Sequence, residues 1–129
     1  MLWRQLVPAI LWSLLIIVFS VLPARQLRQL QVDYLWTSDK LAHAVVYAVL
    51  AFLLSVGLRK QYERFLLRHY HLMIAFLISI SYGLMLELLQ DFMTMGRAGS
   101  LYDQLANMAG AVVGILACIL IFGKAAQPT

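Results

Sequence analysis

Four long apolar runs account for most of this chain and constrain its fold more than any other feature. They are residues 6–22, 41–58, 72–89 and 105–122, each of 17 or 18 residues. As α-helices they are about 26–27 Å long, close to the roughly 30 Å of a bilayer hydrocarbon core. Inside lipid, backbone polar groups must be hydrogen-bonded within the protein, and a helix achieves this within one segment. The sequence therefore predicts an all-α fold, an integral membrane bundle of four transmembrane helices.

The composition argues against a soluble four-helix bundle. Of the 129 residues, 63% are hydrophobic and 12% are charged, about half the charged fraction of a typical soluble domain. A soluble bundle needs a polar stripe along each helix, and these runs lack one over most of their length.

The first run is longer than the 7–15 apolar residues of a signal peptide, so we expect it to be retained as a span. We expect residues 1–129 to form a single domain.

The distribution of charge predicts the topology, because short cytoplasmic loops are enriched in Lys and Arg. Four spans place both termini on the same side as the loop between the second and third runs. That side carries six basic residues and one acidic residue, and the other side carries four basic and five acidic residues. We expect a bacterial inner (cytoplasmic) membrane protein with both termini cytoplasmic. The cytoplasmic set is Arg4, Arg59, Lys60, Arg64, Arg68 and Lys124 with Glu63; the outer set is Arg25, Arg28, Lys40 and Arg97 with Asp33, Asp39, Glu87, Asp91 and Asp103.

The basic loop at residues 58–71 has the spacing of a short amphipathic helix lying in the membrane interface. We expect it to retain the topology and to attract anionic inner-leaflet lipids along residues 59–68, and we expect no nucleic-acid partner. His69 and His71 are expected to be exposed in the same interface. The apolar side of this helix is Tyr62, Phe65, Leu66 and Tyr70, and its basic side is Lys60, Arg64 and Arg68.

Polar residues recur at helical spacing at the outer ends of the last three spans. A charged side chain in a span costs about 2.5–3.5 kcal/mol at the helix centre, so such residues usually face the bundle interior and mark a site. We expect His43 to lie near Glu87 or Asn107. The alternative is a purely structural network of ion pairs and hydrogen bonds. The three stripes are Asp39, Lys40, His43 and Tyr47; Gly83, Glu87, Gln90 and Asp91; and Asp103, Asn107, Gly110 and Gly114.

These stripes supply the candidate site residues. Arg97 is expected to close the site by pairing with Asp103 or Glu87. Should the site be catalytic, His43, Glu87 and Asp103 are the candidates, with His43 as acid or base. We expect no cofactor and no metal. Should a metal ion bind, the candidate ligands are Asp39, His43, Glu87 and Asp91. The candidate ligand-binding residues are Asp39, Lys40, His43, Tyr47, Glu87, Gln90, Arg97, Asp103 and Asn107.

Small residues line one face of the fourth run. Ala106, Gly110 and Gly114 form a small-xxx-small ladder that lets helix backbones approach closely. We expect this ladder to pack against the second and third spans of the same chain rather than to drive dimerisation.

The polar motifs resemble the three signatures of the VanZ-like family of small membrane proteins, over residues 38–118. One departure is the stretch 93–96 before Arg97, where the family pattern leads us to expect a proline. The resemblance implies envelope biology and a link to resistance against antibiotics such as teicoplanin, without established catalytic residues. The motifs are Asp39-Lys40-x-x-His43-x-x-x-Tyr47, then Tyr82-Gly83-x-x-x-Glu87-x-x-Gln90, then Arg97 and Ser100 followed by Asp103-x-x-x-Asn107-x-x-Gly110-x-x-x-Gly114.

Two classes of function remain open. In the first, the protein binds a lipid, a lipid-linked cell-wall precursor or a glycopeptide-type ligand at an outer-facing polar site. In the second, it is an intramembrane enzyme that acts on a lipid-linked substrate with His43 and Glu87 or Asp103. The chain has no HExxH and no GxSxG motif, which favours the binding protein. A transporter is the weakest option, since four spans without an inverted repeat offer little pathway.

Overall fold

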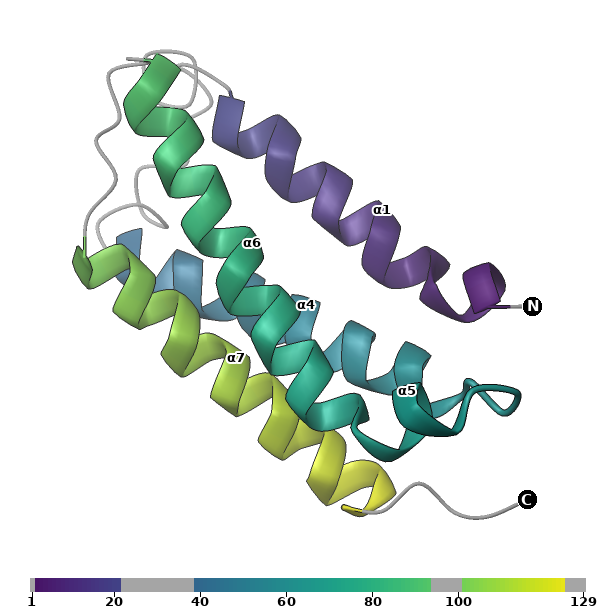
Figure 1. Cartoon of the computed structure of the whole chain (residues 1–129). Helices are drawn as coiled ribbons and strands as arrows, with labels where there is room; N and C mark the ends of the chain where they lie inside the picture. The colour runs from purple at the N-terminus through teal and green to yellow at the C-terminus, as the bar shows by residue number, and fades with distance from the viewer. Residues whose placement is uncertain (1, 22–38, 94–100, 125–129) are drawn as a thin grey trace.

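A computed structural model shows an all-helical bundle and describes residues 2–21, 39–93 and 101–124 (Figure 1). None of these residues is in a β-strand. Four of the helices are long and apolar enough to cross a membrane, which confirms the predicted fold class. The helices are α1 (Leu2–Val21), α4 (Asp39–Arg59), α5 (Phe65–His69), α6 (His71–Met93) and α7 (Leu101–Phe122).

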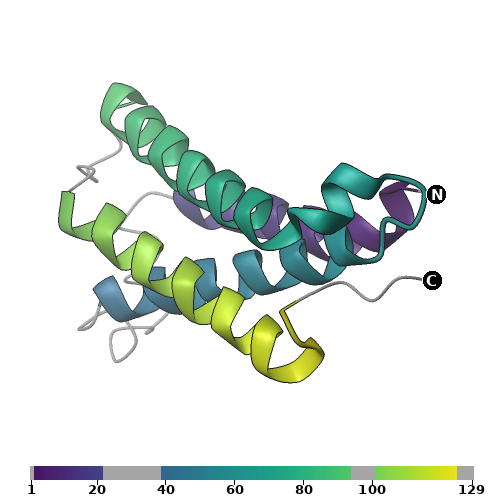
Figure 2. The same ribbon diagram turned by 60° about the horizontal axis from the view of Figure 1, so that its bottom comes forward.

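The bundle has two chemically different ends. α1 and α6 run from one end to the other, and α4 and α7 run in the opposite direction (Figures 1 and 2). We call the end where α4 and α7 begin the site end, and the end with α5 and the C-terminus of α7 the basic end. The described residues of the site end include one basic residue, Lys40, whereas those of the basic end carry six basic residues and one acidic residue, Glu63.

The helices extend beyond the apolar runs that predicted them. α7 begins at Leu101, four residues before its apolar run, and α4 begins at Asp39. The polar stripes therefore lie within the first turns of helices rather than in loops. This extension fixes the direction of each polar side chain relative to the neighbouring helices.

α4 occupies the centre of the bundle and makes its most extensive interface with α7. The two backbones approach so closely that a Cβ atom on Gly110 would collide with the carbonyl oxygen of Ala44, and one on Gly114 with that of Ala48. Two small residues one turn apart on α7 thus meet two on α4. The predicted small-xxx-small packing against the second span is confirmed.

α1 is held against the other helices by hydrogen bonds to backbone carbonyls. Trp12 donates from Nε1 to the Val46 carbonyl at 3.0 Å, which joins α1 to α4. The Tyr82 hydroxyl donates to the Ser13 carbonyl at 2.5 Å, and this bond joins α6 to α1. Between these helices lies a small hydrophobic core formed by Ile16, Tyr47, Leu50 and Leu86.

The basic end closes with a cap that α4 supplies to α7. The Arg59 guanidinium donates to the carbonyls of Phe122 and Gly123 at 2.8 and 2.9 Å. Gly123 has φ of 82°, the left-handed conformation that glycine adopts easily after a helix end. The cation therefore satisfies carbonyls that the helix itself leaves without donors.

The loop between α4 and α6 differs in part from its prediction. Its helix, α5, spans only Phe65–His69, because Arg64 has an extended backbone. The prediction that His71 is exposed is wrong: its side chain is 1% exposed and its Nδ1 donates to the Arg68 carbonyl at 2.8 Å. His71 is the first residue of α6, and its ring closes the turn between the two helices. His69 is exposed as predicted.

Candidate functional site

Asn107 joins three helices at the centre of the candidate site. It lies in the second turn of α7, and its side chain is 1% exposed. Its Oδ1 is 3.0 Å from Nδ1 of His43 on α4. Its Nδ2 donates to Oε1 of Glu87 on α6 at 3.3 Å. The prediction that His43 lies near Glu87 or Asn107 is confirmed, since Asn107 connects the other two residues.

Gly83 provides the space for this network. A Cβ atom at this position would lie 2.8 Å from Nδ2 of Asn107 and 3.1 Å from Cε1 of Tyr47. Both distances are shorter than ordinary van der Waals contact, so any larger residue would displace one of these side chains. The glycine of the second motif therefore serves packing, one turn before Glu87 on the same helix.

Gln104 belongs to the network, although the sequence reasoning missed it. Its Oε1 accepts from Nδ2 of Asn107 at 3.3 Å, and its Nε2 donates to the Ile80 carbonyl on α6 at 3.2 Å. Gln104 precedes Asn107 by three residues, and residues three apart are neighbours on a helix surface. That spacing was the signal available in the sequence.

A gradient of burial leads from the centre of the site to its edge. Glu87 is 9% exposed and Asn107 is 1% exposed, whereas His43 and Asp103 are half-buried. Lys40 is exposed, and its Nζ is 4.8 Å from the centre of the exposed Tyr102 ring, within cation–π range. Tyr102 is a second residue that the sequence reasoning missed. The site therefore has a buried carboxylate and amide at its base and basic groups towards the surface of the bundle.

Some predicted site residues face elsewhere. Gln90 donates from Nε2 to the Ser20 carbonyl of α1 at 3.2 Å, so it bonds to α1 and not to Asn107. Tyr47 is 3% exposed and contributes its ring to the hydrophobic core. Asp91 is exposed near the end of α6. The roles of Gln90 and Tyr47 in binding a ligand, and that of Asp91 in holding a metal, stay predictions.

Other predicted contacts fall on residues outside the described part of the chain. Arg97 is one of these, so its pairing with Asp103 or Glu87 stays a prediction. The same holds for the side chain of Asp39, whose backbone begins α4. Within the described residues, no three His, Cys, Asp or Glu side chains are grouped to hold a metal ion. The candidate ligands His43, Glu87 and Asp91 thus form no such group.

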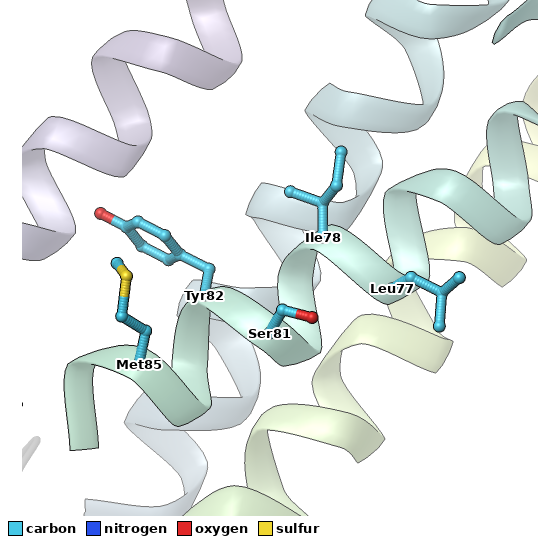
Figure 3. Close-up of a pocket in the computed structure, with 5 residues that line it drawn as sticks. All are labelled: Leu77, Ile78, Ser81, Tyr82 and Met85. Atoms are coloured by element: carbon cyan, nitrogen blue, oxygen red, sulfur yellow. The ribbon is translucent and has the colours of Figure 1, made fainter. Parts of the chain in front are cut away.

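A hollow of about 360 Å³ on α6 is separate from this site (Figure 3). Its lining is almost entirely apolar, and none of the predicted site residues contributes to it. Three of its residues, Leu77, Ile78 and Met85, are substantially exposed although they lie in a membrane-spanning segment. Lipid acyl chains would fill such a surface.

The resemblance carried by the sequence motifs agrees with a comparison against known families. A model of the VanZ/LLP1 family matches residues 5–122. The chain belongs to the VanZ/LLP1 family. The match begins in α1 and ends with α7, so it includes more of the chain than the motifs at 38–118. Comparisons of this VanZ/LLP1 chain with curated proteins and with solved structures give no match.

Proposed function

We propose that this VanZ/LLP1 protein binds the polar head group of a membrane lipid, a lipid-linked cell-wall precursor or a glycopeptide at the site end. The observation that carries the proposal is the hydrogen-bonded chain from Glu87 through Asn107 to His43. It holds a half-buried histidine at the end of three membrane helices. A ligand anchored in lipid reaches that position without leaving the membrane.

The polar groups of the site suit a head group that carries both hydroxyl or amide groups and a phosphate. His43 and the Asp103 carboxylate are half-buried, and Lys40, three residues before His43 on α4, is exposed. A lysine cation attracts a phosphate, and carboxylate and amide oxygens accept hydrogen bonds from hydroxyl or amide donors. The buried Glu87 and Asn107 support the site from below and are not themselves open to a ligand.

The test is a binding measurement on the purified protein in nanodiscs. The probes are phosphatidylglycerol, a polyprenyl-diphosphate-linked muropeptide and teicoplanin, each titrated separately. We expect one probe to bind with an affinity that falls at least tenfold in His43→Ala. The matched control is His69→Ala, which removes an exposed histidine at the basic end. Equal affinities of the wild type and His43→Ala for every probe would contradict the proposal.

The second candidate is an intramembrane enzyme that acts on a lipid-linked substrate. One observation favours it: His43 is oriented through Nδ1 by a residue that is itself anchored to a carboxylate, an arrangement that catalytic bases often have. Incubation with the muropeptide lipid and mass spectrometry of the products would decide between the two. Turnover that His43→Gln abolishes, with binding retained, supports the enzyme; binding without any product supports the binding protein.

A further inference from the structure

The segment from Lys60 to Tyr70 contacts α4 and α6 on one side and presents exposed side chains on the other. α5 contains no buried residue. The side chains of Tyr62, Phe65, Leu66 and Tyr70 are 62%, 72%, 67% and 46% exposed. Four large aromatic or aliphatic side chains within nine residues are an unusual concentration for a surface in contact with water.

The position of this segment indicates what covers these side chains. It connects the end of the span Lys40–Arg59 to the start of the span His71–Phe92. Figures 1 and 2 show α5 at the same end of the bundle as the start of α1 and the end of α7. A connection of this length between two spans lies at the boundary between hydrocarbon and head groups. Tyrosine and tryptophan are enriched at that level.

Basic side chains lie close to these aromatic rings in the sequence, and they differ in what they contact. The Arg59 guanidinium is directed to the carbonyls at the end of α7. Arg68 lies over the Tyr62 ring, with its Cζ atom 5.4 Å from the ring centre. Lys60 and Arg64 are exposed on either side of the single acidic residue, Glu63. These two cations are therefore the groups placed to meet a ligand.

We propose that the segment Lys60–Tyr70 is a binding surface for anionic phospholipid in the leaflet at the basic end. Tyr62, Phe65 and Leu66 enter the head-group region, and Lys60 and Arg64 bind the lipid phosphates. Basic residues at a membrane surface each contribute about fivefold to association with anionic lipid. The proposal concerns the opposite end of the molecule from the His43 site and does not depend on it.

The experiment measures which lipids surround the segment in the full-length protein. Cys118 is replaced by alanine, Phe65→Cys carries a bimane fluorophore, and the protein is reconstituted in phosphatidylcholine vesicles. Phosphatidylglycerol and phosphatidylcholine with a spin label at acyl carbon 5 are then added as quenchers. We expect both lipids to quench the bimane fluorescence. The anionic lipid should reach half-maximal quenching at a mole fraction at least fivefold lower than phosphatidylcholine does. Lys60→Gln/Arg64→Gln is expected to abolish this difference.

The matched control removes the same charge from the same end of the bundle. Arg4→Gln/Lys124→Gln lies outside the segment and is expected to keep most of the lipid preference. An equal loss in both double variants would mean general attraction by the basic end and would overturn the proposal. Absence of quenching by lipid would also overturn it: quenching by aqueous iodide would then show that the rings face water, and protection from iodide would show that they face protein. Both double variants alter exposed side chains, and circular dichroism verifies their fold.

Discussion

Replacement of Asn107 by aspartate tests whether its amide is oriented by Glu87. The substitution keeps the size of the side chain and keeps an oxygen towards His43. It replaces the Nδ2 donor, 3.3 Å from Oε1 of Glu87 and from Oε1 of Gln104, by a second carboxylate oxygen. At this distance two unit charges repel by about 5 kcal/mol at an effective dielectric constant of 20. A charge-assisted bond to His43 returns about 1–1.5 kcal/mol relative to the neutral bond.

Uptake of a proton by one of the two carboxylates relieves part of this repulsion. The balance of these terms predicts that Asn107→Asp lowers the free energy of unfolding by at least about 2 kcal/mol. Glu87→Gln alone is expected to cost less than about 0.5 kcal/mol, because its amide oxygen still accepts a hydrogen bond from Asn107. The double variant Asn107→Asp/Glu87→Gln should recover most of the lost stability, because the glutamine amide then donates to the aspartate. Circular dichroism during titration with sodium dodecyl sulfate in mixed micelles measures each value.

The control for this cycle is a second carboxylate on the same helix. Asp91 is exposed on α6 at the site end, and Asp91→Asn removes one charge without touching Asn107. It should not restore the stability of Asn107→Asp. The reasoning is refuted if Asn107→Asp is as stable as the wild type, or if Asp91→Asn restores it as well as Glu87→Gln does.

Three further measurements test the packing and the topology. Gly110→Ala places a methyl group against the Ala44 carbonyl and should cost about 1–3 kcal/mol in detergent unfolding, whereas the lipid-facing Ala109→Leu should be nearly neutral. Arg59→Gln removes two bonds to the end of α7 and should cost about 1–2 kcal/mol, and Lys60→Gln should cost much less. Reporter fusions at the C-terminus and between α4 and α5 should both be cytoplasmic, and a periplasmic signal from either would reverse the predicted orientation.

Much of the fold follows from the sequence because lipid leaves few choices for the backbone. Apolar runs of span length must be helices, and the steps of three and four between polar residues place them on one face. The proximity of His43 and Asn107 followed from this reasoning, since both occupy the same depth on helices with matching stripes. The glycine ladder on α7 predicted its close contact with α4 in the same way.

The neighbours of each polar residue on α6 were harder to predict. α6 contacts both α1 and α7, so residues only one turn apart turn towards different helices. Glu87 bonds to Asn107 of α7, whereas Gln90 bonds to the Ser20 carbonyl of α1. A helical stripe about 100° wide contains both the direction towards α7 and the direction towards α1. The rotation of the helix about its own axis, which decides between them, cannot be read from the sequence. Hydrogen bonds to backbone carbonyls add to the difficulty, because any residue can supply the acceptor.

The two predictable features, the glycine ladder and the polar stripe, depend on each other in the structure. Gly110 follows Asn107 by three residues on α7, and its contact, Ala44, is the residue after His43 on α4. The close approach of the backbones at this pair therefore sets the separation of the His43 and Asn107 side chains, which meet at 3.0 Å. A larger residue at position 110 would separate the helices at the base of the site and lengthen that bond. The ladder in the membrane is thus part of how this VanZ/LLP1 protein builds its polar site.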